Sequence, residues 1–511
     1  MTTSLERSEA MLHFYFLWQT RLIVLNVSAN MLYPWRLISP QFIILISLHI
    51  IAFAGNNSLR ELKKNNFDAF ATVNSLMSTC IGQCLGLFEK TDSCGFDRAT
   101  GQPIGGYCMS DFFRPTGIDR RVICVYEKND IVRGLSLDLL IESKLCTTIL
   151  VLVTIRFDSK VPTNIRMVIV DEDMHMDAQK ISSKPTVKLH YKLGTGMSMN
   201  DSMNPIDFSR TFDMTIRRGR WVDAMVSLSQ KPEGQYYSGL YIRWLYPGCP
   251  NDDCKVGPAS DEHMLVKALN ELSSAWKSKS PNKVWELAME TSAKADNIYM
   301  GLGIELLGRV LHYFLILTYE WSMPVMTTIP PKTFFQTPYD KIDLAIDGYL
   351  KKAKRDNKRF FLGINPTLIR YALSDSVMTA KYGKGKLASD EYYVNSSASR
   401  YIAFSDACAL ISNASNNYTV VVPKAEELNK TSYAKSDTTF ISFDETNDII
   451  DKVRKIFDKY NNRIGGIWMK NISHDDFTGK ICGCGPFPSL RAGNEGLFGG
   501  GCTMKKCFTK K

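Results

Sequence analysis

The sequence lacks three features that mark common functional classes. No His-x₃₋₅-His pair follows its closely spaced cysteines, so a zinc module is not predicted. No glycine-rich phosphate turn follows the first predicted strand, which argues against an open dinucleotide-binding sheet. No basic stripe interleaved with aromatic residues occurs, although the formal net charge is +10, so nucleic-acid binding is not expected.

Long apolar runs are also scarce. The run Phe42–Ala54 is too short to span a bilayer comfortably, and it follows Arg36 and ends in the small-x-small pattern that signal peptidase recognises. A start at Met31 would make residues 31–54 a conventional signal peptide. Residues 1–54 are therefore interpreted as a signal peptide, or an N-terminal extension plus a signal, and a retained membrane anchor is the alternative.

What the chain does contain fits an exported globular protein. Its 511 residues are 45% hydrophobic and 22% charged, which is ordinary globular composition. Thirteen cysteines at short spacings favour disulfides formed in an oxidising compartment, and the odd number leaves at least one outside an intrachain pair. Beyond residue 54, seven Asn-x-Ser/Thr glycosylation sequons agree with secretion, at Asn56, Asn200, Asn395, Asn413, Asn417, Asn429 and Asn471.

The pattern of turns and cysteines divides the chain into four parts. Residues 1–54 precede a small region, 55–115, whose Cys80, Cys84, Cys94 and Cys108 allow three pairings that sequence cannot separate. A large domain covers 116–495, and a basic tail covers 496–511. Within the tail Cys502 is predicted to pair with Cys507, and Cys249 with Cys254 in a small loop.

Apolar runs rich in β-branched and aromatic residues recur from Arg121 onward, separated by segments with helical spacing. Such buried runs alternating with amphipathic helices indicate a parallel sheet, and eight of them predict a (β/α)₈ barrel. The polar stretch of about 371–437, between the seventh and eighth runs, is too long for a bare loop and predicts an inserted α+β subdomain. The eight runs are 121–126, 147–157, 186–194, 236–247, 283–290, 313–321, 359–366 and 464–472.

The fourth run resembles the motif strand of glycoside hydrolase family 18, the chitinases and chitinase-like lectins. That family carries Asp-Gly-x-Asp-x-Asp-Trp-Glu-Tyr-Pro, and this chain keeps Gly239, Trp244, Tyr246 and Pro247. The closing segments, RIGGIWMKNISHDDFTGKICG and FPSLRAGNEGL, and the sixth-strand Leu317-Thr318-Tyr319-Glu320 are similar too. The resemblance covers most of residues 121–495. It implies disulfides between Cys124 and Cys146, and between Cys408 and either Cys482 or Cys484.

The acids of the family motif are replaced in this chain. Members of the family cleave by substrate assistance, in which a Glu protonates the leaving oxygen and Asp residues stabilise the cationic intermediate. The Glu position is Leu245, and the Asp positions are Ser238, Tyr241 and Arg243. Arg243 places positive charge where positive charge develops, which is the wrong sign for stabilisation. No catalytic residue is therefore predicted.

The resemblance also implies where a sugar would bind. The alignment places Lys470 where the family offers a Trp for the sugar to stack on, and Trp468 lies two residues earlier on the same face. Glu286, Glu290 and Glu320 are other acids at or near strand ends, and Glu320 is expected to form an ion pair with Arg243 or Lys470. The predicted ligand-binding residues are Trp244, Tyr246, Tyr319, Glu320, Trp468 and Lys470.

These observations predict a secreted chitinase-like protein without catalysis that binds chitin, N-acetylglucosamine oligomers or other glycans in the barrel groove. Two alternatives stay open: an active hydrolase with a relocated acid, and a protein-binding factor with no sugar site. No cofactor, metal or nucleic acid is expected, and the sequence does not give the oligomeric state.

Overall fold

The computed structural model describes 17 stretches of the chain, which include all eight strands of the predicted barrel. Predictions that fall on residues 1–54, on most of 55–115 and on the long loops lie outside the described residues. The described residues are 95–96, 103–104, 120–158, 166–194, 205–244, 247, 258, 260–294, 298–299, 302–319, 337–353, 359–373, 394–423, 431–460 and 463–499, with 504 and 506–508 in the tail.

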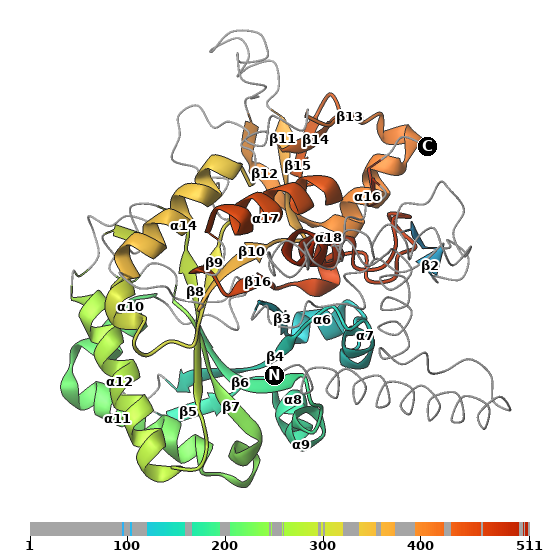
Figure 1. Ribbon diagram of the computed structural model, residues 1–511. Helices are drawn as coiled ribbons and strands as arrows, with labels where there is room; N and C mark the ends of the chain where they lie inside the picture. The colour runs from blue at the N-terminus through green and yellow to red at the C-terminus, as the bar shows by residue number, and fades with distance from the viewer. Residues whose placement is uncertain are drawn as a thin grey trace, which may run out of the picture. The chain divides into compact units, whose positions relative to one another are not determined.

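Eight parallel strands close into a barrel, as the apolar runs predicted (Figure 1). Each strand pairs with its neighbour, and pairing of the first strand with both the second and the last closes the ring. In order along the chain they are β3 (Arg121–Tyr126), β4 (Thr148–Asp158), β6 (Val187–Gly194), β7 (Tyr237–Arg243), β8 (Glu286–Ser292), β9 (Tyr313–Leu317), β10 (Phe360–Ile364) and β16 (Gly466–Met469). A ninth strand, β5 (Arg166–Ile169), pairs antiparallel with the end of β4.

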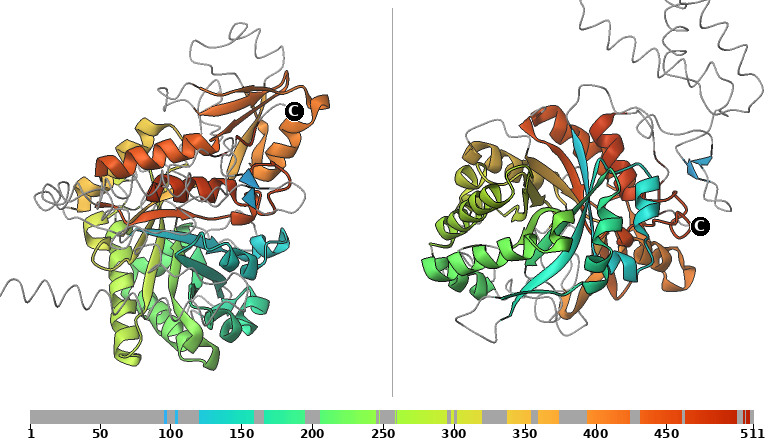
Figure 2. Two further views of the ribbon diagram at one scale, coloured as in Figure 1. Left: turned by 45° about the vertical axis from the view of Figure 1, so that its right-hand side comes forward. Right: turned by 90° about the horizontal axis from the view of Figure 1, so that it is seen from below.

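Helices surround this ring on the outer side of the strands (Figure 2). In α12 (Asp261–Lys279) the buried Leu265, Leu269, Leu272 and Trp276 recur at helical spacing. The other helices of the layer are α6 (Lys128–Val132), α7 (Leu137–Glu142), α8 (Glu172–Met176), α9 (Ala178–Ser182), α10 (Pro205–Asp213), α11 (Thr215–Ser229), α13 (Ile304–Leu307), α14 (Tyr339–Ala353), α17 (Thr446–Tyr460) and α18 (Pro488–Phe498).

The predicted insertion between the seventh and eighth barrel strands forms an antiparallel sheet with one helix. Its five strands lie in the order β12, β11, β15, β14, β13, and α16 (Phe404–Ser412) packs on them. The elements begin at Thr367 and end at Phe443, slightly wider than predicted. The strands are β11 (Thr367–Leu373), β12 (Val394–Ala403), β13 (Thr419–Val421), β14 (Ser432–Lys435) and β15 (Thr439–Phe443).

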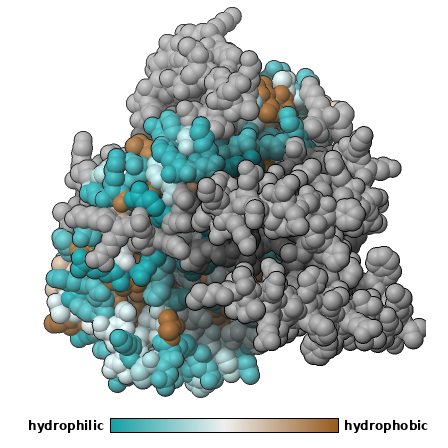
Figure 3. Space-filling view, viewed as in Figure 1, coloured by the Kyte–Doolittle hydropathy of each residue, from teal (hydrophilic) through white to brown (hydrophobic). Residues whose placement is uncertain are grey.

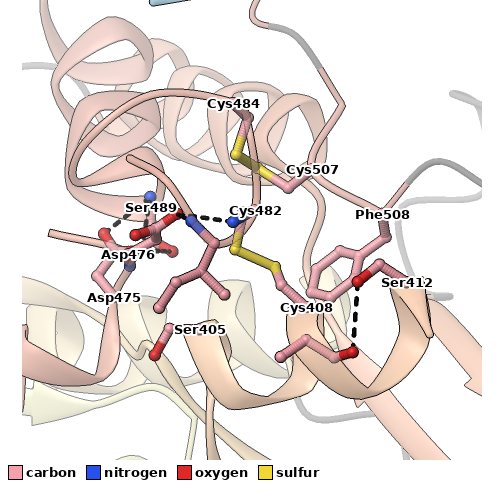
Figure 4. The surroundings of a disulfide bond; sticks show 12 residues. Ser405, Cys408, Ser412, Asp475, Asp476, Cys482, Cys484, Ser489, Cys507 and Phe508 are labelled. Carbon is pink, nitrogen blue, oxygen red and sulfur yellow. Dashed lines mark hydrogen bonds between the residues drawn. A yellow bond between two sulfur atoms is a disulfide. The ribbon is translucent and has the colours of Figure 1, made fainter. Parts of the chain in front are cut away.

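Three disulfides hold the described part of the chain, and one differs from the prediction. Cys124 joins Cys146 across the first two barrel strands, and Cys408 of α16 joins Cys482, which decides between the two partners that the sequence left open. The prediction that Cys507 pairs with Cys502 was wrong, because Cys507 is bonded to Cys484 (Figure 4).

Packing of the tail explains that different pairing. Phe508 lies against Phe404 and Phe443 of the insertion, and its backbone N–H and that of Cys507 donate to the buried Glu445 carboxylate. These contacts bring Cys507 beside Cys484, where the two Cα atoms are 5.2 Å apart. Proximity along the sequence alone therefore misled the prediction.

The described part of the N-terminal region is a pair of short strands. Two short strands, β1 (Gly95–Phe96) and β2 (Pro103–Ile104), pair antiparallel within the predicted cysteine-containing region. Within the described ranges, no helix is both long enough and apolar enough to cross a membrane. The apolar run 42–54 lies outside the described residues.

Candidate functional site

The inner face of the barrel is set by strand alternation, which points every second side chain inward. On β7 this places Tyr241 inward, in a cluster with Ile123, Leu315 and Trp468, while Leu240 and Ile242 point to the helix layer. Arg243 is next in the inward series and ends the strand. It therefore lies at the C-terminal mouth of the barrel, the end where active sites of this architecture occur.

Gly239 shows why the motif strand keeps a glycine below these residues. It pairs with Glu286 of the neighbouring strand, and a Cβ at this position would lie 2.0 Å from the Glu286 carbonyl oxygen. Any side chain there would push β7 and β8 apart. The retained glycine is therefore explained by strand packing.

Glu290 of β8 is the centre of the mouth. Its side chain is fully buried, and the Tyr241 hydroxyl donates a 2.6 Å hydrogen bond to one carboxylate oxygen. The other oxygen accepts a 3.0 Å hydrogen bond from Lys470 Nζ and lies 3.2 Å from Arg243 Nε. Tyr241 and Arg243 of β7 and Lys470, which follows β16, thus converge on one carboxylate.

The charges of this cluster hold one another ionised. Burial of the Glu290 carboxyl raises its pKa, but the charges of Lys470 and Arg243 and the Tyr241 hydrogen bond outweigh burial and lower the pKa to about 2. Burial and the charge of Glu290 raise the pKa of Tyr241 well above its ordinary value. At neutral pH Glu290 is therefore a carboxylate, and Tyr241 keeps its proton.

A second ion pair lies at the same end of the barrel. Lys192 Nζ, from β6, is 2.6 Å from the carboxylate of Glu127, the residue that follows β3 and precedes α6. Lys192 belongs to the inward series of its strand, two residues after His190. The sequence analysis missed this pair, although polar residues at every second position of an apolar run would have indicated it.

The aromatic residues predicted to bind sugar are mostly packed inside the protein. Trp468 is fully buried, and its Nε1 donates to the Ile316 carbonyl oxygen at 3.0 Å. Tyr319, just beyond β9, is 3% exposed, with its ring 6.1 Å from that of Trp468. Gly363 makes room for both, since a Cβ there would lie 2.8 Å from the Tyr319 ring and 3.1 Å from Trp468 Nε1.

Trp244 has a packing role outside the barrel. Its ring stacks on Phe208 at 5.1 Å between centroids and also contacts Phe212 of the same helix, α10. It is 1% exposed and belongs to the core between strands and helices. The structure thus separates Trp244 from the residues that face the barrel interior.

The structure does not describe three of the predicted site residues. Leu245, Tyr246 and Glu320 lie outside the described ranges, as do Cys249 and Cys254. Arg243 and Lys470 were the predicted partners of Glu320, and both of them contact Glu290. Ser238, the remaining motif position, is half-buried near the start of β7.

Glu286 lies at the opposite, N-terminal end of the barrel. Its carboxylate is 2.6 Å from Lys188 Nζ and accepts a 3.0 Å hydrogen bond from the Tyr313 hydroxyl. Burial raises its pKa, but hydrogen bonds and charges from His190 and Lys188 lower it to about 2. Because this end of such barrels serves stability, Glu286 is assigned to the structural interior.

Within the described parts of the chain, no group of three or more His, Cys, Asp or Glu side chains is arranged to hold a metal ion. The polar side chains of the mouth instead contact one another. The arrangement can hold charge in place and offer hydrogen bonds at the rim, but its central carboxylate is already engaged by two cations and a phenol.

Comparison with known proteins agrees with this architecture. Human chitinase-3-like protein 2 is 22% identical over 353 residues, which are 65% of this chain and 82% of that protein. Sheep oviduct-specific glycoprotein is 24% identical over 293 residues, 55% of this chain and 50% of that protein. The chain thus spans about half the length of the latter relative.

Solved structures show the same fold. Catalytic domain 2 of the Ostrinia furnacalis group II chitinase superposes with a TM-score of 0.61 at 21% identity, covering 76% of this chain and all of that domain. Human YKL-39 superposes with a TM-score of 0.56 at 16% identity, covering 74% of this chain and 99% of that one. The family model for glycosyl hydrolases family 18 matches residues 121–475, and the chain belongs to this family.

Proposed function

We propose that this chain is a non-catalytic member of family 18 that binds N-acetylglucosamine oligomers or related glycans at the barrel mouth. The observation that carries the proposal is the motif strand itself. Leu245 stands where the family carries the glutamic acid, and Tyr241 and Arg243 stand at two of the aspartate positions. We also propose that the protein is secreted, because its three described disulfides form and persist in an oxidising compartment.

The chemistry of the mouth supports the loss of catalysis. A leucine has no proton to give to a leaving oxygen, and general acid catalysis contributes about 10²–10⁴-fold to such reactions. Arg243 and Lys470 add two cations near the place where a cationic intermediate would form. Their field disfavours that intermediate, whereas the aspartates of the family favour it.

Glu290 is poorly suited to replace the missing acid. A general acid needs a proton near neutral pH, and the pKa of Glu290 is lowered to about 2. Its two oxygens are also engaged by Tyr241, Lys470 and Arg243. It serves instead as the counter-charge for the two cations.

Support for glycan binding comes from two similar structures. Human YKL-39 is described as a pseudo-chitinase with retained chitooligosaccharide binding properties. A glutamate-to-leucine variant of the Ostrinia furnacalis chitinase domain was solved in complex with a penta-N-acetylchitooligosaccharide. Loss of an acid is therefore compatible with binding in proteins of this fold, and we extend that compatibility to this chain.

A protein-binding factor without a sugar site is the second candidate. It is favoured by the burial of Trp468 and by Lys470 at the place of the family's stacking Trp, because a sugar needs an open aromatic face. This candidate shares the absence of catalysis and differs only in what the mouth binds. Retention on chitin that soluble N-acetylglucosamine oligomers compete away would exclude it.

Product analysis tests the catalytic part of the proposal. The secreted full-length protein is incubated with a chitooligosaccharide, and the products are followed by mass spectrometry beside an active family member. We expect no shortening of the oligosaccharide. Cleavage that the Glu320→Gln substitution abolishes would overturn the proposal and establish a hydrolase with a relocated acid.

A further inference from the structure

The segment that joins α16 to β13 carries two glycosylation sequons within the seven residues 413–419. Asn413 and Asn417 are both exposed, and so are the hydroxyl residues of their sequons, Ser415 and Thr419. The Asn413 side-chain oxygen accepts a 3.0 Å hydrogen bond from the Ser415 backbone N–H. Asn417 adopts a left-handed backbone with φ of 54°, which places it at the tip of the turn.

The sequon at Asn471 has the opposite environment. Its side-chain nitrogen, the atom to which a glycan is attached, donates a 3.2 Å hydrogen bond to Thr367 Oγ1. Ser473 of the same sequon is 1% exposed. A glycan there would replace a contact between the barrel and the insertion, so the folded protein must carry Asn471 unmodified.

The strand that follows the two exposed sequons is an edge of the inserted sheet. In the described part of that sheet β13 pairs with β14 alone. Val421 and Val422 are 36% and 39% exposed at its end. In Figure 3 a hydrophobic patch is visible in the area of the inserted sheet. An uncovered strand edge of this kind is a template for pairing with another chain.

We propose that Asn413 and Asn417 carry N-linked glycans, and that these glycans cover the free edge of β13. Asn417 precedes the first residue of the strand by two positions, so no more than about 7 Å of chain separates the attached sugar from the edge. An N-glycan is bulky and hydrated, which suits it to exclude a second strand. The two sequons thus protect an edge of β13 that has no partner strand in the described part of the sheet.

The modification is an ordinary group transfer with a lipid-pyrophosphate-linked oligosaccharide as co-substrate. The asparagine side-chain nitrogen forms a bond to the anomeric carbon of the sugar, while the bond from that carbon to the pyrophosphate oxygen breaks. The lipid pyrophosphate leaves with the electron pair, and the amide nitrogen loses one proton. No oxidant or reductant is needed.

Site occupancy is the first test. The full-length protein is secreted from a eukaryotic cell line, its glycans are removed enzymatically in ¹⁸O-labelled water, and the labelled positions are identified by mass spectrometry. The glycan-free peptide containing Asn413 and Asn417 should carry two labels, and the Asn471 peptide none. An unlabelled peptide at Asn413 and Asn417, or a labelled Asn471, would overturn the assignment.

The covering role is tested by association in solution. The double variant Asn413→Asp and Asn417→Gly removes both sequons while keeping the hydrogen-bond acceptor of the first and the left-handed backbone of the second. Light scattering should show a mass that rises with concentration toward twice the mass of the variant's own monomer. The control Asn200→Asp, which removes a sequon elsewhere, should not show this rise.

A third substitution makes the outcome specific to the edge. Adding Val421→Lys to the double variant puts a charge on the exposed strand, which blocks edge pairing. The mass should then return to that of the variant's own monomer. A double variant that does not associate, or one whose association survives Val421→Lys, would overturn the covering role.

Discussion

Arg243 and Glu290 form an ion pair across two adjacent strands of the barrel, with Arg243 Nε 3.2 Å from a carboxylate oxygen. Arg243 ends β7 at the C-terminal mouth of the barrel, and Glu290 is fully buried. Lys470 contacts the same oxygen from the eighth strand. One buried carboxylate thus holds Arg243 and Lys470 in a charge cluster.

Removal of the central carboxylate should destabilise the fold. Glu290→Gln leaves Arg243 and Lys470 buried without the charge that both contact, and breaking such a buried pair typically costs about 3–5 kcal/mol. Urea-induced unfolding followed by fluorescence measures the loss. The matched control is Glu305→Gln in the partly exposed pair with Arg309, where the expected loss is about 0–1 kcal/mol. Equal losses of unfolding free energy in the two variants would show that the buried cluster stabilises the fold no more than an exposed ion pair does.

The same cluster predicts how stability responds to acid. The pKa of Glu290 is about 2 in the folded chain, below its ordinary value of 4.5, so folding favours the ionised form. Its stabilising contribution is complete above about pH 4.5 and disappears as the pH falls toward 2. Measured across that window, the difference in unfolding free energy between wild type and Glu290→Gln should shrink steadily. A difference that stays constant would contradict the assigned charge state.

Restoring the motif acids should not restore catalysis. The triple variant Leu245→Glu, Arg243→Asp and Tyr241→Asp rebuilds the family pattern on β7, but Lys470 remains where the family offers a stacking Trp. Its carboxylates would also lie beside Glu290, which loses a cation and a hydrogen bond. We expect little chitooligosaccharide cleavage, measured by product mass spectrometry. Substantial turnover would show that the rest of the groove is intact.

The disulfide of the tail makes a separate prediction. Cys484→Ser with Cys507→Ser opens a link between cysteines 23 residues apart, and closing a loop of this size contributes about 3 kcal/mol. Thermal unfolding should therefore begin at lower temperature, as Phe508 leaves Phe404 and Phe443. Cys502→Ser should leave the Cys484–Cys507 peptide intact in non-reducing mass spectrometry. A peptide linking Cys502 to Cys507 in the wild type would contradict the structure.

Sequence predicted the barrel because its strands are buried on both faces and so appear as apolar runs. Each of the eight runs became a strand, and the long polar gap became the inserted sheet. The need for a glycine at position 239 could not be predicted from the apolar run of β7. It depends on how closely the backbones of β7 and β8 approach each other. The motif glycine was predicted only through the family resemblance.

Pairing within the site was harder to predict than the site itself. The family motif singled out Arg243 and Lys470, and Glu290 contacts both in the structure. The expected pairing of Glu320 with one of them stays a prediction, because Glu320 lies outside the described residues. Which acid meets which cation depends on the inward layers of different strands, and these require the register between strands. The same lack of spatial information led to Cys502 being chosen as the partner of Cys507.

Calorimetric titration with N-acetylglucosamine oligomers tests the central claim most directly, because heat reports binding and turnover in one experiment. The account predicts saturable heat from each injection that returns to baseline, as expected for binding without cleavage. Heat that continues after injection would mean turnover and would contradict the non-catalytic assignment. The absence of heat at two temperatures would contradict glycan binding at the mouth.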